Sequence, residues 1–377
     1  MANAGSNRLL VLADSSSIHT QRVVNGLCKK GWEILLLSWR PPSHRSLFNP
    51  GVRLITLPIP PRGPLRVLFA IVGLALQHLF SVQLVNSHFV STYGLAAAKI
   101  HQLSPNCPLV TSTWGSDVLR LDPRIAPLVT EALRNSCIVT ADGGEVERKL
   151  LELGAQPNQM RLVSFGVDTT LFDSRPPRKD LKPSNWLHSD PIVVSLRTLS
   201  VGYDVGTLVR AAPKILQVIP SAKFLIVGDG PERVNLEREV TKRSLAAHFW
   251  FPGRVDHDFL PDYLNLATLY VSTSLSDSGP AISTLEAMSV GMPAVVTNLP
   301  DNLSFVEETG TCSLFRSGDA EDLASKVIDL LQMSPERRIQ ISATNRALVR
   351  REFDWERCLD RWDQLLREAR GGEHGRY

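Results

Sequence analysis

Residues 271–297 read VSTSLSDSGPAISTLEAMSVGMPAVVT, and this stretch decides the fold. An apolar, strand-like run ends here in a loop of small hydroxyl, acidic, glycine and proline residues, and a strongly helical segment begins near Ala281. Gly291 and Pro293 end that segment before a second apolar run at 293–297. The order of strand, loop, helix and strand is the repeating unit of a parallel sheet covered by helices.

The loop in this stretch has the chemistry of an anion site. Residues 276–283 bring backbone N–H groups to a helix N-terminus, where unpaired donors and the helix dipole favour a phosphate. Glu286 lies farther along the same helix, where a carboxylate can accept hydrogen bonds from the hydroxyls of a ribose. A plain turn with an N-cap serine has the same composition, so the residues alone leave both interpretations open.

The alternation of apolar strands and helical segments continues outward from this stretch and occurs twice, as expected for a chain of 377 residues. A proline-rich segment without periodicity separates the two runs. We therefore predict an N-terminal domain over 1–172, a linker over 173–190 and a C-terminal domain over 191–354, with a final helix at 355–369 that packs back onto the first domain. Continuous apolar strands predict an α/β fold with two doubly wound parallel sheets. Strands are expected at 8–13, 33–38, 52–57, 82–87, 108–113, 136–141 and 161–165, and then at 191–196, 222–227, 249–251, 268–273 and 293–297.

The composition argues against several classes of protein. The 41 Lys and Arg residues against 38 Asp and Glu give a formal charge of +3, and no basic run stands out, so nucleic-acid binding is not expected. The five cysteines are scattered without a C-x-x-C pair, so neither a disulfide framework nor a zinc site is indicated. A reducing cytosol fits this cysteine usage.

The most apolar stretch, VLFAIVGLAL at 67–76, is too short to span a bilayer, and a run of this length is usually a buried helix. The alternative is that its apolar face, with Arg62 and Arg66, rests on a membrane surface, which requires the patch to be exposed. The first apolar run, at 9–13, is too short for a signal peptide. We expect a cytoplasmic protein, with peripheral contact to the inner face of the membrane as the alternative.

The segment at 271–297 resembles the signature of the retaining glycosyltransferases of family four, in which LEAM-x-x-G-x-P-V-V follows a small-residue loop. The resemblance implies the GT-B fold, in which two Rossmann-like domains face each other across a cleft, and a nucleoside diphosphate sugar as the donor. It extends over nearly the full chain. Further similar segments are VLADSSSIHTQRVVNGLCKKGWEILLLS (11–38), LVNSHFVSTYGLAAA (84–98), TSTWGSDVLR (111–120), SFGVDTTLF (164–172), SLRTLSVGYDVGTLVRAA (195–212), FLIVGDGP (224–231) and FPGRVDHDFLPDYL (251–264).

The resemblance assigns the donor site to the C-terminal domain. Arg197 stands where the phosphate-binding arginine of the family follows the first strand, and Glu286 stands where a glutamate holds the donor ribose. The remaining implied donor-binding residues are Gly228, Asp277, Ser278, Gly279 and Ile282, together with Gly253, Arg254 and Val255 near the nucleobase.

The resemblance places the acceptor in the N-terminal domain, with candidates Ser16, His19, His88, Trp114 and Asp117. His88 and Asp117 are candidates for a hydrogen-bonding or general-base pair, which makes the predicted catalytic residues His88, Asp117, Arg197 and Glu286. Structural alternatives exist: His88 as a satisfied strand-end histidine, Asp117 as a helix N-cap, and His19 as a residue that simply lines the cleft. In the C-terminal domain, His257 and Asp258 are expected to form a solvated loop and an N-cap.

Four positions depart from the family pattern. Tyr203 replaces a lysine that usually follows the phosphate-binding arginine, and Ser278 replaces the first of two paired glutamates. Asp277 is one residue early for that acidic role. Ser304 stands where a glutamate is common, and Trp114 stands where a histidine is often found.

The implied reaction transfers a sugar, with retention, to a hydroxyl of a glycan, a glycolipid or a small molecule. Catalysis would rest on positioning and on stabilisation of the departing diphosphate by Arg197 and the amides of 278–282. No metal and no other cofactor is expected, since the sole D-x-D, at 256–258, lies in a loop. The alternatives are an inactive GT-B subunit that binds a partner or a sugar nucleotide, and an epimerase. A dinucleotide dehydrogenase is disfavoured because no G-x-G-x-x-G follows a strand.

Overall fold

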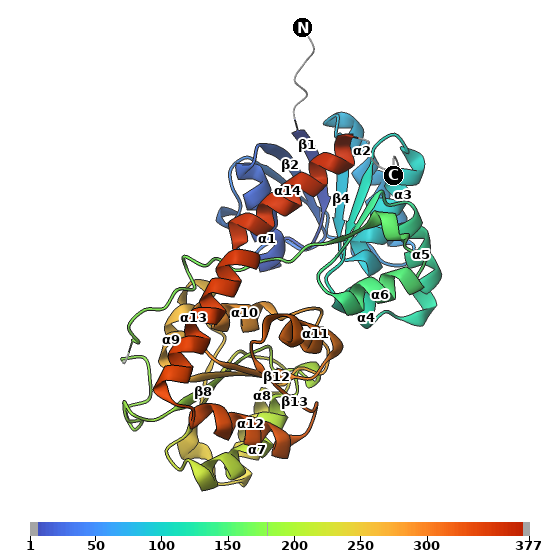
Figure 1. Ribbon diagram of the computed structural model, residues 1–377. Helices are drawn as coiled ribbons and strands as arrows, with labels where there is room; N and C mark the ends of the chain where they lie inside the picture. Colours follow the sequence, from blue (N-terminus) through green and yellow to red (C-terminus); the bar gives the residue numbers. More distant parts are fainter. Residues whose placement is uncertain (1–6, 179, 372–377) are drawn as a thin grey trace. The chain divides into compact units, whose positions relative to one another are not determined.

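The computed structural model describes residues 7–178 and 180–371 and divides the chain into two compact units. The first unit contains the described residues up to Phe165 and those from Arg357 onward, and the second contains Gly166–Glu356. Each unit is built on one parallel sheet with helices packed around it (Figure 1). The predicted α/β fold with two doubly wound sheets is confirmed.

Seven parallel strands form the sheet of the first unit. The chain runs outward in one direction, returns to the centre, and then runs outward in the other, which is the doubly wound order. In spatial order the strands are β3 (Val52–Thr56), β2 (Trp32–Ser38), β1 (Asn7–Leu12), β4 (Leu84–His88), β5 (Leu109–Ser112), β6 (Ile138–Ala141) and β7 (Met160–Leu162). The helices are α1 (Ile18–Lys29), α2 (Leu65–Leu79), α3 (Leu95–Leu103), α4 (Ser116–Leu119), α5 (Ala126–Arg134), α6 (Gly144–Glu152) and α14 (Trp355–Gly371).

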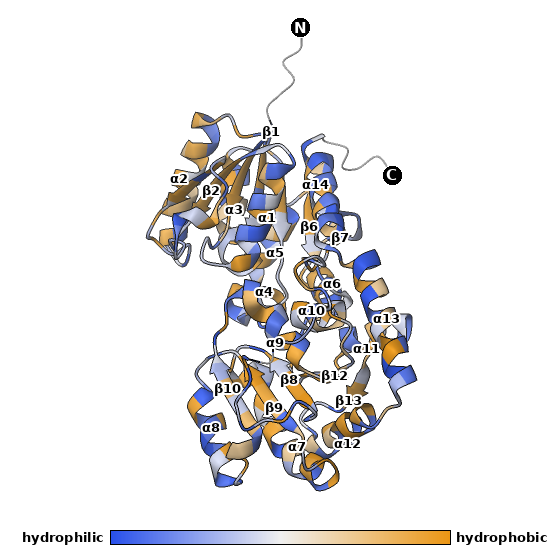
Figure 2. Cartoon of the chain, turned by 90° about the vertical axis from the view of Figure 1, so that its left-hand side faces the viewer, coloured by the Kyte–Doolittle hydropathy of each residue, from blue (hydrophilic) through white to orange (hydrophobic). Residues whose placement is uncertain are grey.

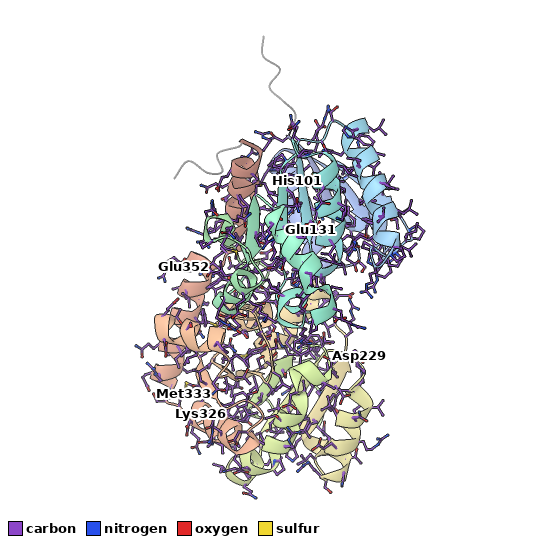
Figure 3. All side chains as sticks on the ribbon, turned by 90° about the vertical axis from the view of Figure 1, so that its right-hand side faces the viewer. His101, Glu131, Asp229, Lys326, Met333 and Glu352 are labelled. Atoms are coloured by element: carbon purple, nitrogen blue, oxygen red, sulfur yellow. The ribbon has the colours of Figure 1, made fainter. Side chains whose placement is uncertain are left out.

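The strands of this sheet are apolar along their whole length because helices cover both of its faces. Leu9 to Leu12 on β1 are completely buried, with no alternation between the two sides. On one face α3 and α5 are neighbours, and Figure 3 labels one residue of each, His101 and Glu131. Lys99 Nζ and Gln102 Nε2 of α3 both donate to Glu131 Oε1 of α5, at 3.2 and 2.6 Å. Burial of the strands therefore accounts for the continuous apolar runs in the sequence.

The last helix, α14, packs on the first unit. Its Asp360 bonds to Lys30 at 2.6 Å, and Asp363 Oδ1 accepts a hydrogen bond from the buried Trp32 indole at 2.7 Å. Trp362, on the side facing the sheet, is 1% exposed. The chain thus returns, after building the second unit, to complete the core of the first.

Six parallel strands form the sheet of the second unit, in the same doubly wound order. They are β10 (Phe249–Gly253), β9 (Lys223–Val227), β8 (Ile192–Leu196), β11 (Leu269–Ser272), β12 (Ala294–Thr297) and β13 (Ser313–Phe315). The short β13 is absent from the strands predicted above, because three residues carry too little pattern. The helices are α7 (Val205–Val218), α8 (Arg233–Lys242), α9 (Leu260–Leu266), α10 (Ile282–Ser289), α11 (Pro300–Thr309), α12 (Ala320–Leu331) and α13 (Pro335–Glu352).

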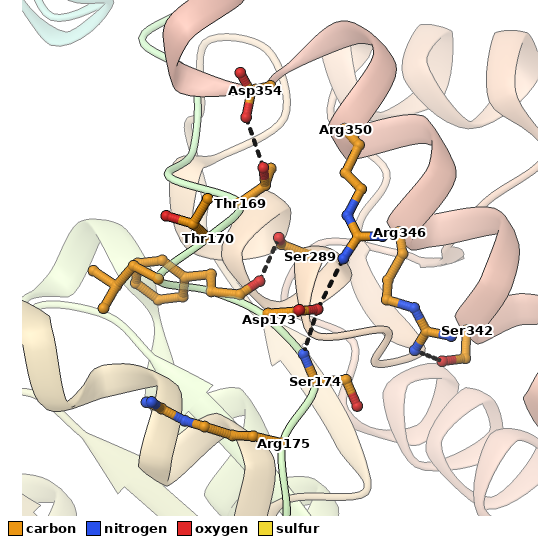
Figure 4. A network of polar contacts seen from close by, with 12 residues as sticks. Thr169, Thr170, Asp173, Ser174, Arg175, Ser289, Ser342, Arg346, Arg350 and Asp354 are labelled. Atoms are coloured by element: carbon orange, nitrogen blue, oxygen red, sulfur yellow. Dashed lines mark hydrogen bonds and ion pairs between the residues drawn. The ribbon is translucent and has the colours of Figure 1, made fainter.

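The segment after Phe165 is held against the second unit by specific polar contacts (Figure 4). Ser289 Oγ at the end of α10 donates to the carbonyl of Phe172 at 2.6 Å, and Arg350 of α13 pairs with Asp173 at 2.9 Å. Farther along, Trp186 is 4% exposed and packs edge-on against Trp250, with ring centroids 6.1 Å apart. The part of 173–190 that the structure describes thus contributes to the core of the second unit.

The contacts of α14 generate a stability prediction. We expect Asp363→Ala to lower the free energy of unfolding by about 1–3 kcal/mol, because the Trp32 indole N–H stays buried without an acceptor. Asp360→Ala, one turn earlier, is the matched control: its carboxylate is 64% exposed, so its ion pair with Lys30 contributes about 0–1 kcal/mol. Urea denaturation of both variants measures the difference, and equal losses would contradict the role given to Asp363.

Candidate functional site

The strand order of the second unit reverses between β8 and β11, which are hydrogen-bonded neighbours. In open α/β sheets the loops that follow two such strands diverge and leave room for a ligand at the carboxyl ends. Arg197 is the first residue after β8, and Asp277 lies in the loop after β11. The switch point of this sheet therefore brings together two residues predicted for the donor site.

Arg197 is held at this point with its side chain only 10% exposed. Its guanidinium pairs with the carboxylate of Asp277 and donates to Ser283 Oγ at 3.2 Å. The ring of Tyr203 lies 4.5 Å from the guanidinium carbon, in a cation–π contact. Burial alone would lower the pKa of Arg197, but the Asp277 charge, with Tyr270 and Tyr203, raises it above its ordinary value. The arginine therefore remains charged.

The Nε donor of this guanidinium remains unused. Arg197 Nε is buried and makes no hydrogen bond to any residue that the structure describes. Ser283 Oγ also contacts the Tyr270 hydroxyl at 2.8 Å, which orients it beside the arginine. The sequence indicated Ser283 only for its backbone N–H and did not indicate Tyr270. Neither side chain lies in a pattern that indicates contact with an arginine.

The loop after β8 is pressed against the loop after β9, and two glycines allow the approach. A Cβ on Gly228 would lie 2.1 Å from the Arg197 carbonyl oxygen, and one on Gly230 would lie 2.3 Å from that of Leu199. Both glycines have positive φ, at +140° and +158°. Gly228 thus sets the backbone position of Arg197, whatever contact it makes with a donor.

Glu286, the residue predicted to hold a ribose, is on α10 with its side chain 6% exposed. Its Oε1 lies 3.0 Å from His257 Nε2, and the His257 ring packs on Phe172 with centroids 5.1 Å apart. Because His257 follows β10 closely, this contact brings the Gly253–Val255 backbone, Arg254 included, toward α10. The expectation of a solvated loop at His257 is wrong, because its side chain is 25% exposed and has a buried partner.

The neighbouring N-cap prediction is also wrong. Asp258 is 86% exposed at its side chain, and the residue that precedes α9 as its N-cap is Phe259. The 3-10 turn at His257–Phe259 follows Asp256 instead. A short 3-10 turn before α9 shifts the helix start beyond the residues that looked like a cap.

The predicted amide nest ahead of α10 is partly occupied. The N–H of Gly279 donates to Oδ2 of Asp301, a residue of α11, at 2.9 Å. The helix begins at Ile282 after Ala281, which has no capping side chain. The first amides of α10 are those of Ile282 and Ser283. Because they lie in the first turn, no carbonyl of the helix can accept their hydrogen bonds, and they point toward its N-terminal end. Ser278 lies in this loop, whereas Ser304 is on the exposed side of α11, where its hydroxyl donates to the Pro300 carbonyl at 3.2 Å.

The first unit has a pocket of about 290 Å³ at the carboxyl ends of its strands. Among its lining residues are Asp14 after β1, Trp39 and Arg40 after β2, Arg62 before α2, and Trp114 after β5. Arg40 Nη1 lies 3.5 Å from Asp14 Oδ2, and its guanidinium carbon is 4.3 Å from the Trp39 ring. The pocket combines flat aromatic faces with two cations and one carboxylate.

His88 borders this pocket but is almost fully buried. Its Nε2 lies 3.0 Å from Asn86 Oδ1, and Nδ1 has no hydrogen-bond partner in the described chain. Burial, with a smaller contribution from the nearby His19, lowers the pKa of His88 to about 3. The imidazole is therefore neutral at ordinary pH. Its ring packs near Trp114 and Trp362, with centroids 5.4 and 6.3 Å away.

Asp117 lies behind the pocket, inside α4, where it is 3% exposed. Its two oxygens accept hydrogen bonds from the amides of Trp114 and Val90, at 2.8 and 2.6 Å. Burial raises the pKa of this carboxyl to about 6. The alternative of an N-cap does not hold, because Gly115 is the N-cap of α4. Asp117 and His88 thus have separate partners, and Asp117 fixes the loops that present Trp114.

The two other acceptor-side candidates lie at the edge of this arrangement. His19, on α1, packs between Trp114 and Phe165, with ring centroids 5.4 and 5.1 Å away. Ser16 bonds through its hydroxyl to Asp14 Oδ1 at 2.6 Å in the loop after β1. Ser16 therefore orders Asp14, which does line the pocket.

Two features are absent from residues 7–178 and 180–371. No helix there is long and apolar enough to cross a membrane. No group of three or more His, Cys, Asp or Glu side chains is arranged as the ligands of a metal ion.

Two family models match the chain. Residues 8–142 match the model described as glycosyl transferase 4-like, and residues 178–347 match the one described as glycosyl transferases group 1. The chain belongs to the group 1 glycosyl transferases. The suspected resemblance to family four is confirmed by these matches, and the protein is a glycosyltransferase with two Rossmann-like domains.

Named relatives of this glycosyltransferase transfer different sugars. It is 25% identical over 303 residues to the GDP-mannose-dependent alpha-(1-6)-phosphatidylinositol monomannoside mannosyltransferase of Mycobacterium tuberculosis, covering 76% of this chain and 78% of that protein. It is 28% identical over 216 residues to the sulfoquinovosyl transferase of Arabidopsis thaliana, covering 56% of this chain and 40% of that protein. The chain thus spans less than half the length of the plant relative.

A solved structure of HepE from Anabaena, in complex with UDP and glucose, superposes on this glycosyltransferase with a TM-score of 0.78. The match covers 96% of this chain and 99% of HepE at 18% sequence identity. At that identity the likeness shows the fold alone.

The buried His88 generates a pH prediction. Because folding lowers its pKa from 6.5 to about 3, the unfolded state binds an extra proton between these values. The stability contributed by neutral His88 is complete above pH 6.5 and is lost as the pH falls toward 3, by up to roughly 1.4 kcal/mol per pH unit. We expect His88→Gln to flatten the fall in unfolding free energy in this window, and an unchanged slope would contradict the burial argument.

Proposed function

We propose that this glycosyltransferase moves a sugar, with retention, from a nucleoside diphosphate sugar bound by the second unit to a hydroxyl acceptor bound by the first. The observation that carries the donor assignment is the buried Arg197 at the switch point, with its Nε–H unused, beside the N-terminus of α10. A diphosphate is the anion that fits a guanidinium and helix amides placed together.

The donor's diphosphate takes its stabilisation from Arg197 and from the first amides of α10. As the bond between the anomeric carbon and the phosphate oxygen breaks, negative charge grows on the diphosphate, and these preorganised donors favour that charge. Tyr203 supports the guanidinium through its ring where the family commonly has a second cation. The residues that surround Arg197 thus favour a leaving group with two phosphates without any resident metal or other cofactor.

The ribose lies against Glu286 in this proposal. A carboxylate accepts two hydroxyl donors well only when its orientation is set, and His257 sets it by contacting Oε1 at 3.0 Å. His257 acts through Glu286 and is a positioning residue. The backbone of Gly253–Arg254–Val255, tied to the same corner through His257, takes the nucleobase.

The acceptor hydroxyl enters through the pocket of the first unit. Its oxygen forms the new bond to the anomeric carbon on the face that the diphosphate leaves, and its proton passes to a phosphate oxygen, so no protein nucleophile is needed. The aromatic faces of Trp39 and Trp114 suit a sugar ring, and Arg40 and Arg62 suit an anionic group attached to it. We favour a glycolipid or a charged glycan as the acceptor, at the inner face of a membrane in a cytoplasmic protein.

A nucleotide panel tests the donor site. UDP, GDP, ADP and CDP are titrated against the protein by thermal shift, and the nucleotide that binds is retested with Arg197→Ala and Glu286→Ala. We expect each variant to weaken binding by about 10- to 100-fold, since each removes a charge-assisted contact. Arg316→Ala, a surface arginine of the same unit whose side chain is 70% exposed, is the control. If Arg197→Ala leaves nucleotide binding unchanged, the assignment of the donor site is wrong.

Release of nucleoside diphosphate from the matching nucleotide sugar then tests turnover. Release that depends on Arg197 supports the transferase. Binding of the nucleotide with no release from any nucleotide sugar, in the presence of glycan and glycolipid acceptors, supports the inactive subunit instead.

Asp277 is tested separately, because its carboxylate is paired with the Arg197 guanidinium that a diphosphate would bind. We expect Asp277→Asn to tighten nucleotide binding several-fold, since the neutral amide competes less well for Arg197 than an anion does. Isothermal titration with the nucleoside diphosphate measures the change. Weaker binding would mean that Asp277 contacts the donor directly.

A further inference from the structure

The helix α2 presents an apolar face to solvent. Val67, Leu68 and Ile71 are 52%, 44% and 52% exposed, and Leu79 at the end of the helix is 75% exposed. At the helical spacing these positions fall on one side of α2 and form one stripe, while Phe69 on the other side is fully buried. Figure 2 shows α2 at the edge of its unit, largely in the colour of hydrophobic residues. The expectation of a buried helix is wrong for this stripe.

The stretch of chain that contains α2 carries charge of one sign. Between Glu33 and Asp117 the chain contains no acidic residue at all. The same stretch contains six cationic residues, which are Arg40, Arg45, Arg53, Arg62, Arg66 and Lys99. An apolar stripe of this size on a globular protein marks an interaction site, and the excess of cations along this segment narrows the kind of partner.

Arginines lie at both ends of the helix. Arg62 and Arg66 are at its N-terminal end, and Arg53 lies over the ring of Phe80 at its C-terminal end, 5.2 Å from the centroid. None of the three has a carboxylate within ion-pair distance in the part of the chain that is described. Glu131, whose pKa is lowered in part by Arg66, is bonded to Lys99 and Gln102. The three charges are thus available to an external anion.

The N-terminal end of α2 also reaches the acceptor pocket. Arg62, three residues before the helix, lines that pocket together with Trp39 and Arg40. The apolar stripe is therefore adjacent, along the chain, to the loop that lines the acceptor pocket. A surface that contacts the stripe lies close to that loop. A membrane with anionic headgroups matches an apolar stripe bordered by unpaired arginines better than a protein partner, which would need acidic side chains around an apolar centre.

We propose that α2 docks this protein on an anionic phospholipid surface, with its apolar stripe at the headgroup boundary and Arg53 and Arg66 on lipid phosphates. The helix has 15 residues and lies on the membrane rather than across it. Arg62 then faces both the membrane and the pocket, so the pocket receives the headgroup of an acceptor that stays anchored in the bilayer. This last step rests on the proposed function.

Vesicle co-sedimentation of the full chain tests the docking. Wild-type protein is expected to bind vesicles that contain phosphatidylglycerol, to bind phosphatidylcholine vesicles much less, and to lose binding as salt is raised. We expect Val67→Gln with Ile71→Gln to reduce binding at least tenfold. The matched control is Val234→Gln with Ile339→Gln, a valine and an isoleucine that are 61% and 70% exposed on α8 and α13, and it should bind as the wild type does.

The charges are tested with Arg53→Gln combined with Arg66→Gln, which should reduce binding to phosphatidylglycerol vesicles about tenfold and weaken its salt dependence. Arg238→Gln with Arg337→Gln, two arginines of the second unit, is the control. Equal binding by the α2 variants and their controls overturns the proposal. A change in oligomeric state of the α2 variants on size exclusion, without any vesicle binding by the wild type, overturns it in favour of self-association.

Failure of docking and failure of the proposed function are distinguishable. Nucleotide binding and release of nucleoside diphosphate are measured without vesicles, and Val67→Gln with Ile71→Gln should leave both unchanged, because neither residue lines the pocket or the donor site. If the wild type does not bind vesicles yet turns over donor, docking alone is wrong. If vesicles bind but no nucleotide does, the donor assignment is wrong and the membrane surface stands.

Discussion

A buried guanidinium is the constraint on which the second unit depends. The charge of Arg197 lies at the point where the strand order reverses, with little access to water, and a charge in that position is costly unless an anion accompanies it. Asp277 supplies the anion from the loop after β11, and Ser283 adds a neutral contact from α10. The pair therefore ties together two loops that the sheet topology separates, and it defines where an external anion can bind.

The same constraint gives a physical reason for a departure from the family pattern. With a lysine in place of Tyr203, two cations would share this corner with one carboxylate. Tyr203 instead supports Arg197 through the negative face of its ring and adds no charge. The corner is then close to neutral before a donor arrives, and Arg197 depends more on its carboxylate partner. Gly228 and Gly230 belong to this arrangement because only residues without a Cβ let the neighbouring loop pass so near the backbone of Arg197 and Leu199.

The polar residues of the first unit have two separate roles: some hold loops in place, and others line the pocket that a ligand would enter. His88 and Asp117 are both buried, and burial disfavours the charged form of each. The pKa of His88 is therefore lowered and that of Asp117 is raised. They order the loops that end β4 and β5. The exposed chemistry of the pocket belongs instead to Trp39, Arg40 and Arg62, which come from loops after β2 and before α2. Because Arg62 directly precedes α2, the pocket and the apolar stripe are parts of one continuous segment.

The sequence by itself determined the two doubly wound sheets, the position of Arg197 after a strand and that of Glu286 on the helix within the 271–297 segment. Those features are local: apolar periodicity and the order of strand, loop and helix are written in consecutive residues. Only the tertiary structure decided that His257 reaches Glu286 from 29 residues away, that Asp277 pairs with Arg197, and which side of α2 meets solvent. The sequence of a largely apolar helix does not show which of its faces other segments will cover. Likewise, the sequence of a loop does not show which strand end will lie beside it in the sheet. Both depend on which distant segments pack together.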